Sequence, residues 1–318
     1  MLRLLVADGD VAEGRRRVAQ TAGATFAETY AEVLRSLAPA AHIDIATPAD
    51  EGARLPADIG SYDGVAITGS SLNVYKREPG TLRQIDFVRE AFNGGVPIFG
   101  SCWGLQLAAV VAGGEVAPNP KGREIGFARN ITLTGMGREH AMHAGRPLSY
   151  DAPAVHYDEI VRLPDNTVVT AENSMSDVQA AEIRFGNGIF WGVQYHPELS
   201  LRDMAATMRR NRAALLAEGF FLSADDLNRH ASDLDLLHGD RKRRDIAWRI
   251  GLGAEITDDQ KRICEIANWI ACQVLPRATS RGSIILSSSP TPIALPCVST
   301  ERNTKDSPTS SMQKARKR

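Results

Sequence analysis

Cys102 is the residue whose surroundings most clearly indicate chemistry. It lies in the segment Gly100–Gln106 (GSCWGLQ), after an apolar run and at the start of a helical pattern. A sharp turn from strand to helix presents a nucleophile at the carboxyl end of a sheet, and glycine tolerates the strained backbone that such a turn needs. A helix N-terminus also favours the thiolate, the reactive form of cysteine. A buried structural cysteine is the alternative explanation for Cys102 taken alone.

His196 and Glu198 follow a second apolar run, Ile189–Tyr195, at the point where that run ends. Pro197 fixes the direction in which the chain leaves, and a turn can bring the carboxylate back to the imidazole. A carboxylate on one ring nitrogen fixes the tautomer and leaves the other nitrogen free to take a thiol proton. An isolated His-Pro-Glu is also explained as a solvated loop. Together with Cys102 it forms a Cys-His-acid set, which is far more specific than either segment.

These two segments resemble those of the class I glutamine amidotransferases. Gly100–Gln106 resembles the GxCxGxQ nucleophile signature of that family, and Val193–Glu198 resembles its Q[FY]HPE signature. The resemblance covers roughly residues 1–220 and is nearest to the glutaminase domain of GMP synthetase. It implies a flavodoxin-like fold and no cofactor. It also implies hydrolysis of glutamine to glutamate and ammonia through a γ-glutamyl thioester on Cys102.

A thioester mechanism needs two N–H donors aimed at the developing oxyanion. The residue after the nucleophile usually supplies one, which assigns the amide of Trp103. The loop after the run ending at Thr68 resembles the family's SGGP segment, which implies that Ser70 N–H is the second donor and that Gly69 permits the turn. This chain departs from the family there, with Ser70 in place of the second glycine and Ser71 in place of the proline. A plain turn also explains a Gly-Ser-Ser loop.

Further polar positions carry weaker indications. By the same resemblance Gln106 helps to hold the substrate glutamine, although a surface helical glutamine is the alternative. The segment His156–Glu159 resembles a stretch that lies near the site in the GMP synthetase branch, and a structural role for His156 explains it at least as well. His140 and His143 have helical spacing but no clear third ligand, so we predict no metal site.

The first half of the chain predicts the elements that position these residues. Short apolar runs alternate with helical patterns, which is typical of βαβ units and a mostly parallel sheet. The fold class expected is therefore α/β, a flavodoxin-like three-layer sandwich with helices on both faces of the sheet. The predicted strands are Leu2–Ala7, Ile43–Ala46, Val65–Thr68 and Val96–Gly100. The predicted helices are Phe26–Leu37, Leu82–Phe92 and one that begins with Leu105–Val111.

The second half predicts short strands that extend the same sheet, followed by helices. The strands are Glu124–Asn130, Ile131–Thr134, Val168–Ala171, Gln179–Phe185 and Ile189–Tyr195, with a hairpin turn at Asn187-Gly188. After Ser223 the pattern is helical. We expect a capping box at Thr257–Gln260, helical spacing to Val274 and an end at Pro276. The domains predicted are an amidotransferase-like domain at 1–222, a helical extension at 223–276 and a disordered basic tail at 277–318.

Composition limits the classes of partner. The formal net charge is −1, and the predicted tail carries eight Lys or Arg against two Asp or Glu, which leaves about −7 on the rest. This balance does not favour nucleic acid or membrane as partners. The four cysteines show no CxxC pair, which favours a reducing cytoplasm over a disulfide scaffold. No run approaches the roughly 20 apolar residues of a membrane span.

Three functions fit these residues. The first is a glutaminase that releases ammonia for a synthetase partner, since the phosphate-binding loops that GMP synthesis needs are absent from the sequence. The second is a stand-alone γ-glutamyl hydrolase, peptidase or transferase. The third is a non-catalytic binding protein of the same fold, which the presence of Cys102, His196 and Glu198 disfavours.

Overall fold

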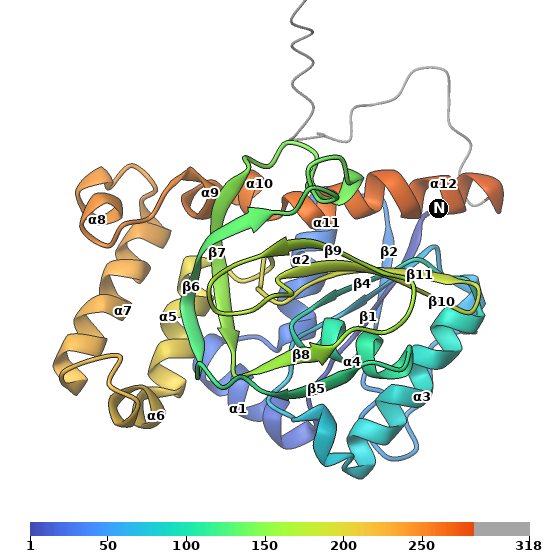
Figure 1. Cartoon of the computed structure of the whole chain (residues 1–318), viewed down its shortest axis with the longest axis horizontal. Coiled ribbons are helices and arrows are strands. Elements are labelled where there is room, and N and C mark those ends of the chain that lie inside the picture. Colours follow the sequence, from blue (N-terminus) through green and yellow to red (C-terminus); the bar gives the residue numbers. More distant parts are fainter. Residues whose placement is uncertain (283–318) are drawn as a thin grey trace, which may run out of the picture.

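A nine-stranded sheet with helices on both faces forms the centre of the molecule in the computed structural model, which describes residues 1–282 (Figure 1). The strand order is β2-β1-β3-β4-β11-β10-β9-β6-β7. The strands are β1 Arg3–Ala7, β2 His42–Ala46, β3 Gly64–Ile67, β4 Ile98–Ser101, β6 Glu124–Leu133, β7 Ser149–His156, β9 Thr167–Glu172, β10 Ala180–Phe185 and β11 Gly188–Val193. A small separate sheet pairs β5 (Glu115–Pro118) with β8 (Asp158–Arg162).

The direction of the strands divides the large sheet in two. Neighbouring strands from β2 to β11 are parallel, whereas the pairs from β11 to β7 are antiparallel. The predicted α/β sandwich is confirmed, and so is the prediction that the strands of the second half extend the same sheet. Since β4 and β11 are parallel neighbours, their carboxyl ends lie at the same edge of the sheet.

The helices are distributed along the whole described chain. They are α1 Ala12–Ala22, α2 Phe26–Leu37, α3 Pro79–Asn93, α4 Trp103–Val111, α5 Leu201–Arg210, α6 Arg212–Ala217, α7 Ala224–Gly239, α8 Arg244–Arg249, α9 Ala254–Thr257, α10 Asp259–Arg262, α11 Cys264–Trp269, the π-helix η4 Ile270–Val274 and α12 Leu275–Ser280. Short 3₁₀ turns are η1 Ile59–Ser61, η2 Val74–Lys76 and η3 Ala141–His143.

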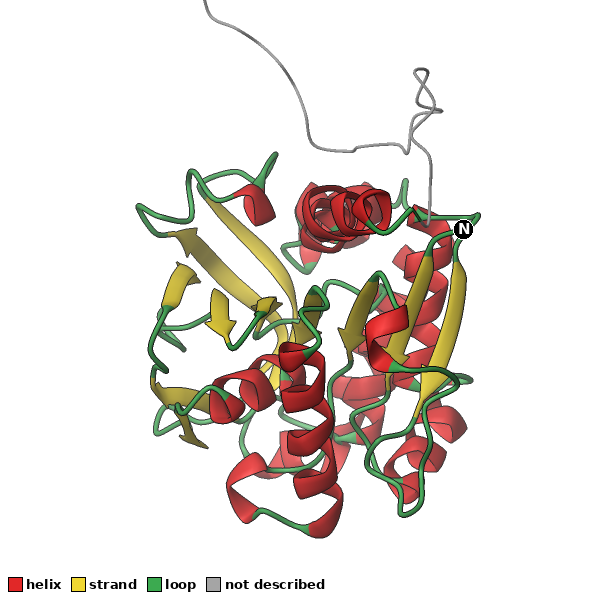
Figure 2. Ribbon diagram, turned by 90° about the vertical axis from the view of Figure 1, so that its right-hand side faces the viewer, coloured by secondary structure: helices red, strands yellow, loops and turns green. Residues whose placement is uncertain are grey.

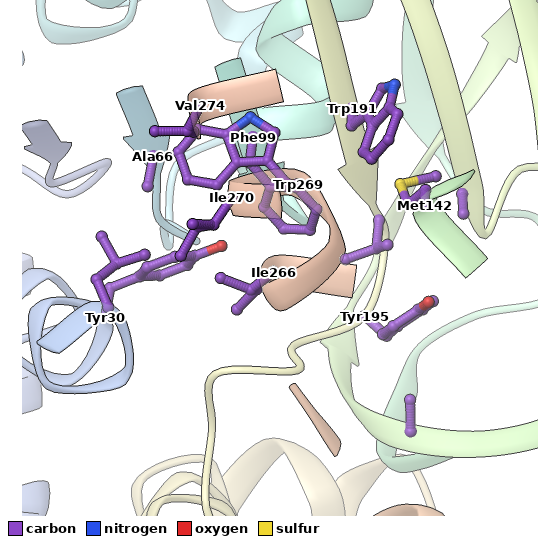
Figure 3. Packing of buried hydrophobic residues seen from close by; sticks show 14 of the residues in the cluster. Tyr30, Ala66, Phe99, Met142, Trp191, Tyr195, Ile266, Trp269, Ile270 and Val274 are labelled. Carbon is purple, nitrogen blue, oxygen red and sulfur yellow. The ribbon is translucent and has the colours of Figure 1, made fainter. Parts of the chain in front are cut away.

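Alternation along the strands gives the sheet two buried faces. In β1, Leu4 and Val6 belong to a cluster with α2 and α11, while Leu5 and Ala7 belong to a cluster with α3 and α4. Figure 3 shows the first cluster, in which Trp269 from the C-terminal helices packs against the sheet. The two clusters explain why the sheet is covered by helices on both sides.

The C-terminal extension (residues 223–282) docks onto the rest of the chain. Its first part, α7, packs on α5, and the run from α11 to α12 packs on the sheet, where it is seen nearly end-on above the strands in Figure 2. The packing is close: a Cβ at Gly64 would lie 2.8 Å from both Trp269 and Val274. The run from α11 to α12 is therefore part of the same hydrophobic core as the sheet, whereas α7 shares a separate cluster with α5.

Two predictions about this extension were wrong. Asp258, rather than Thr257, caps the helix that begins at residue 259, because its carboxylate accepts from two main-chain N–H groups. Pro276 does not end the helix, which continues through η4 and α12 to Ser280. The π-helical hydrogen bond from the N–H of residue 275 to the carbonyl of Ile270 re-phases the helix before the proline, which then occupies the first turn of α12. The segment 277–280, assigned to the tail, is thus helical. Residues 281 and 282 form a turn, and the remainder of the predicted tail, 283–318, lies outside the described residues.

Other differences concern the strands and three helices, since α5 and α6, like α1, were not predicted. The two strands predicted at 124–130 and 131–134 are one bulged strand, β6, in which Asn130 has a φ of 51°. The hairpin between β10 and β11 exists, but Phe185 pairs with Gly188, so its two-residue turn is one position earlier than predicted. Helix α1 was not predicted because only Gly14 and Val18 of its residues are buried. Strands β5, β7 and β8 were also missed.

Candidate active site

The backbone at Cys102 has the strained conformation expected of a sharp turn between β4 and α4. Its φ is 50° and its ψ is −97°, values that non-glycine residues rarely adopt, and its N–H donates to the carbonyl of Val193 at 2.7 Å. Strand and helix approach closely here, since a Cβ at Gly100 would lie 2.9 Å from the Cα of Gly104. The Gly100–Gln106 sequence therefore fits a turn that presents the sulfur at the edge of the sheet.

His196 and Glu198 lie beside this turn, in the loop between β11 and α5. Glu198 Oε1 accepts a hydrogen bond from His196 Nδ1 at 2.7 Å, and both side chains are 98% or more buried. Cys102 lines the same cavity as His196 and lies close enough to raise the pKa of the imidazole, while its Sγ lies 3.7 Å from the carbonyl oxygen of Val155. The structure thus brings together all three residues of the predicted Cys-His-acid set.

The charge state of His196 follows from these neighbours. Burial lowers the pKa of His196, but the Glu198 carboxylate and the nearby side chain of Cys102 outweigh burial and raise this pKa to about 10. At neutral pH the imidazole is therefore protonated, and its positive charge faces the same cavity as the Cys102 sulfur.

Ser101 completes the environment of Glu198, and its contribution was not predicted. Its hydroxyl donates to Glu198 Oε2 at 2.8 Å and lies 3.3 Å from the hydroxyl of Tyr30 in α2. Both oxygens of the buried carboxylate are thereby bonded, which fixes its orientation. The signal in the sequence was a serine at the end of an otherwise apolar strand.

Arg262 of α10 also contacts the loop that carries His196 and Glu198. The sequence analysis did not predict this contact. The buried guanidinium of Arg262 donates to the carbonyl oxygens of Pro197 at 2.5 Å and Leu199 at 3.0 Å. The C-terminal extension contacts this loop a second time, because the Tyr195 hydroxyl donates to a carboxylate oxygen of Glu265 in α11 at 2.9 Å. The C-terminal extension therefore contacts the His196 loop on both sides of the histidine.

The two predicted oxyanion donors lie at the same edge. Trp103 is the first residue of α4, so its N–H has no acceptor within the helix. Among residues 1–282, no acceptor for the N–H of Ser70 is found. Gly69 contacts the imidazole so closely that a Cβ there would lie 2.5 Å from His196 Cε1, which explains why this position needs glycine.

Asp10 explains how the loop keeps its shape without the family's second glycine and proline. Its Oδ1 accepts from the hydroxyl of Ser70 at 3.0 Å and from both the N–H and the hydroxyl of Ser71, at 3.0 Å and 2.8 Å. Side-chain anchoring thus replaces the restriction that a proline imposes on the backbone. A carboxylate that precedes α1 is also favoured by the helix dipole.

These residues face a cavity of about 310 Å³, which is large enough for a small molecule. Cys102, His196, Ser70 and Gln106 all line it. Gln106 is buried, and its Nε2 donates to the carbonyl of Asp158 at 3.2 Å, so it is a cavity residue and not the exposed helical residue of the alternative explanation.

The other histidines that the sequence analysis considered are hydrogen-bonded to protein groups. His156 lines the cavity, but its Nε2 bonds Glu124 at 2.8 Å and its Nδ1 the carbonyl of Asp158 at 3.1 Å. His140 bonds Glu182 at 3.1 Å, and His143 bonds a threonine hydroxyl. Within the described part of the chain, no three His, Cys, Asp or Glu side chains are grouped as metal ligands would be.

Comparisons with known proteins agree on the class to which this arrangement belongs. The sequence model of the family Glutamine amidotransferase class-I matches residues 22–215, more than half of the chain. The chain therefore belongs to the class I glutamine amidotransferase family.

Individual relatives differ in how much of the chain they match. A γ-glutamyl-L-1-hydroxyisopropylamide hydrolase of a Pseudomonas species is 36% identical over 280 residues, which cover 87% of this chain and 95% of that protein. A glutamine-hydrolysing GMP synthase subunit of Ignicoccus hospitalis is 30% identical over 49% of this chain and 77% of that protein. The crystal structure of a glutamine amidotransferase from Thermotoga maritima shares the fold, with a TM-score of 0.58 at 17% identity, over 84% of this chain and 98% of that one.

The described residues also bear on the membrane prediction. No helix among residues 1–282 combines the length and the apolar character that crossing a bilayer requires.

Proposed function

We propose that this enzyme hydrolyses γ-glutamyl amides through a γ-glutamyl thioester on Cys102. The observation that carries the proposal is that Cys102 and His196, from two distant segments of the chain, line one cavity, while Glu198 hydrogen-bonds the imidazole of His196. A sulfur, an imidazole and a carboxylate in this order are the groups that acyl transfer by a cysteine needs.

In the first half of the reaction, the Cys102 thiolate attacks the γ-carbonyl carbon and a tetrahedral oxyanion forms. We assign the N–H groups of Trp103 and Ser70 as donors to that oxyanion, with Gly69 allowing the loop to approach. The imidazolium of His196 then gives its proton to the leaving nitrogen. The C–N bond breaks, the amine departs and the γ-glutamyl thioester remains.

In the second half, water replaces the amine. His196, now neutral, takes a proton from the attacking water, and the resulting oxyanion collapses with loss of the thiolate. Glutamate is released, and the proton on His196 restores the starting state. Throughout, Glu198 fixes the tautomer and the orientation of the imidazole. Gln106 is proposed to contact the γ-glutamyl group.

The extent of similarity favours a hydrolase that acts alone over an ammonia-delivering component of a larger enzyme. The Pseudomonas hydrolase matches 87% of the chain, which takes the match into the C-terminal extension, whereas the Ignicoccus GMP synthase component matches about half. Ammonia release to a synthetase partner is the second candidate, and the similarity to that GMP synthase component is the observation that supports it.

The test is an assay of the purified chain against glutamine and γ-glutamylethylamide, with Cys102→Ala as the control. We expect release of the amine without any added protein, and a loss of at least about 10³-fold in kcat in the variant. Amine release that stays negligible until a synthetase is added would favour the second candidate. Equal rates in the wild type and Cys102→Ala would overturn the thioester.

A further inference from the structure

Asp10, in the loop after β1, is a buried carboxylate that binds one short loop. Among the described residues, all of its side-chain hydrogen bonds come from Ser70 and Ser71, and all three reach Oδ1. A Cβ at Gly14 would lie 2.7 Å from Asp10 Cγ, so the first turn of α1 closes over the carboxylate. Because a buried carboxylate is costly without hydrogen bonds, the positions of Asp10 and of the serine loop depend on one another.

The contacts with Asp10 define the backbone around Ser70. The Ser70 hydroxyl donates to Asp10 at 3.0 Å and accepts from the N–H of Leu72 at 3.1 Å. The N–H of Ser71 donates to the same carboxylate oxygen at 3.0 Å. The peptide units on the C-terminal side of Ser70 are therefore held, and with them the direction of its own N–H, which we assign as an oxyanion donor.

Gly9, next to Asp10, lies between the two segments that supply the assigned donors. A Cβ at Gly9 would lie 2.7 Å from Cδ1 of Trp103 and 2.8 Å from the carbonyl oxygen of Gly69. Its N–H donates to the hydroxyl of Thr68 at 2.9 Å. The loop after β1 therefore separates the serine loop from the start of α4.

Gln84 of α3 connects this loop to the other donor. Its buried side chain donates from Nε2 to the carbonyl of Gly9 at 2.9 Å and accepts from the indole Nε1 of Trp103 at 2.9 Å. Residues 9 and 10 thus contact the serine loop directly and the Trp103 side chain through Gln84. The distance between the N–H groups of Ser70 and Trp103 depends on this arrangement.

The sequence of the serine loop leaves its shape to such outside contacts. The family's SGGP segment has proline where this chain has Ser71, and a proline fixes its own φ. Serine has no such restriction. We propose that Asp10 is a positioning residue of the oxyanion hole, whose carboxylate holds the N–H of Ser70 towards the developing oxyanion in place of the restriction that a proline at position 71 would impose. This inference rests on the proposed hydrolysis of γ-glutamyl amides.

Asp10→Ala tests the role of the carboxylate. With γ-glutamylethylamide we expect kcat to fall about 10²-fold and KM to stay within about threefold, because the donors stabilise a charge that forms only in the transition state. Asp10→Asn keeps an acceptor oxygen and should retain kcat within about tenfold. The matched control is Asp151→Ala, which removes a carboxylate that also accepts from a side chain and a main-chain N–H, those of Arg129 and Asn130, but lies outside the cavity. It should keep the wild-type kcat.

Alkylation of Cys102 separates positioning of the oxyanion hole from general damage to the site. In the reaction with iodoacetamide a C–S bond forms at a saturated carbon and iodide leaves, so no oxyanion develops. We expect the alkylation rate of Cys102 in Asp10→Ala to stay within about twofold of the wild type, as measured by peptide mass spectrometry. A loss of alkylation as large as the loss of kcat would overturn the inference, because Asp10 would then act on Cys102 itself.

A rescue tests whether Asp10 and the family's loop sequence are alternatives. Ser70→Gly and Ser71→Pro, introduced together into Asp10→Ala, should recover at least about tenfold of the lost kcat, since two independent losses would only accumulate. A triple variant that folds and is as slow as Asp10→Ala would contradict the exchange. If the triple variant does not fold, the alkylation comparison decides.

The outcomes distinguish this inference from the function on which it rests. An active wild type together with an unchanged kcat in Asp10→Ala would overturn the positioning role and leave the proposed function in place. A wild type that hydrolyses neither glutamine nor γ-glutamylethylamide would overturn the proposed function.

Discussion

The two halves of the site are held in different ways. Cys102 is placed by its own short segment, in which the strained backbone and the close approach of Gly100 to Gly104 define the turn. His196 is placed by residues far away in the chain, among them Ser101 on β4 and Arg262 on α10. The position of Cys102, the proposed nucleophile, is thus a local property, whereas the position of His196, the proposed base, depends on the C-terminal extension and on the neighbouring strand.

The largest loss of activity is expected when Glu198, the proposed partner of the base His196, is replaced. Glu198→Gln keeps the shape of the side chain but removes the charge that holds His196 protonated. Because general acid–base catalysis contributes about 10²–10⁴-fold, we expect kcat for γ-glutamylethylamide to fall by about 10²-fold or more. Steady-state kinetics measures this, with far-UV circular dichroism as the check on folding. Activity within tenfold of the wild type would show that Glu198 does not orient the base.

A smaller effect is expected from the contact with the extension. Arg262→Met removes the donors to the Pro197 and Leu199 carbonyls, and we expect kcat to fall about tenfold with little change in KM. Arg262→Lys should recover part of the loss. The matched control is Asp259→Asn, which removes an ion pair of Arg262 but leaves its contacts with the loop. Equal losses of kcat in the two substitutions would mean that Arg262 acts on stability and not on the loop.

Ser101→Ala should have a weaker effect still. It removes one of the two hydrogen bonds that fix the Glu198 carboxylate but leaves the 2.7 Å contact with His196 intact. A lost hydrogen bond of this kind corresponds to roughly 0.5–1.5 kcal/mol, so we expect a loss of about three- to tenfold in kcat. Tyr30→Phe, which removes only the hydroxyl that bonds Ser101, should cost less than Ser101→Ala. A larger loss of kcat in Tyr30→Phe than in Ser101→Ala would contradict the expectation that Tyr30 acts on Glu198 through Ser101.

The pH dependence of stability gives a further test. The folded-state pKa of His196 is about 10, above its unfolded value of about 6.5, so its contribution is fully present below pH 6.5 and is lost as the pH rises towards 10. In Glu198→Gln this dependence should largely disappear. Urea unfolding at a series of pH values measures the free energy of unfolding for both chains. Parallel curves between pH 6.5 and 10 would show that Glu198 does not raise the pKa of His196.

The same contrast explains what the sequence could predict. The turn at Cys102 and the His-Pro-Glu segment were predictable because each is encoded in a few adjacent residues with specific backbone demands. The support from Ser101, Arg262 and Asp10 was not, because each contact joins residues 60 or more positions apart, as in the 97 positions between Ser101 and Glu198. Such contacts depend on strand order and helix docking, which local patterns do not define.

The errors in the fold have a similar origin. Proline normally ends a helix, but in this chain the π-helix before Pro276 removes the conflict, and tertiary packing of Trp269 against the sheet keeps the helix in place. Helix α1 buries too few residues to show a hydrophobic period, although it contributes Arg17 to the cavity.

The most direct test of the central claim is to label the enzyme with a γ-glutamyl electrophile such as 6-diazo-5-oxo-L-norleucine and to map the modified residue by peptide mass spectrometry. The account predicts one label per chain on Cys102, formed in proportion to the loss of activity and slowed by glutamine. Cys264 and Cys272 should remain unmodified. Complete inactivation with Cys102 unlabelled, or full activity with Cys102 labelled, would contradict the account.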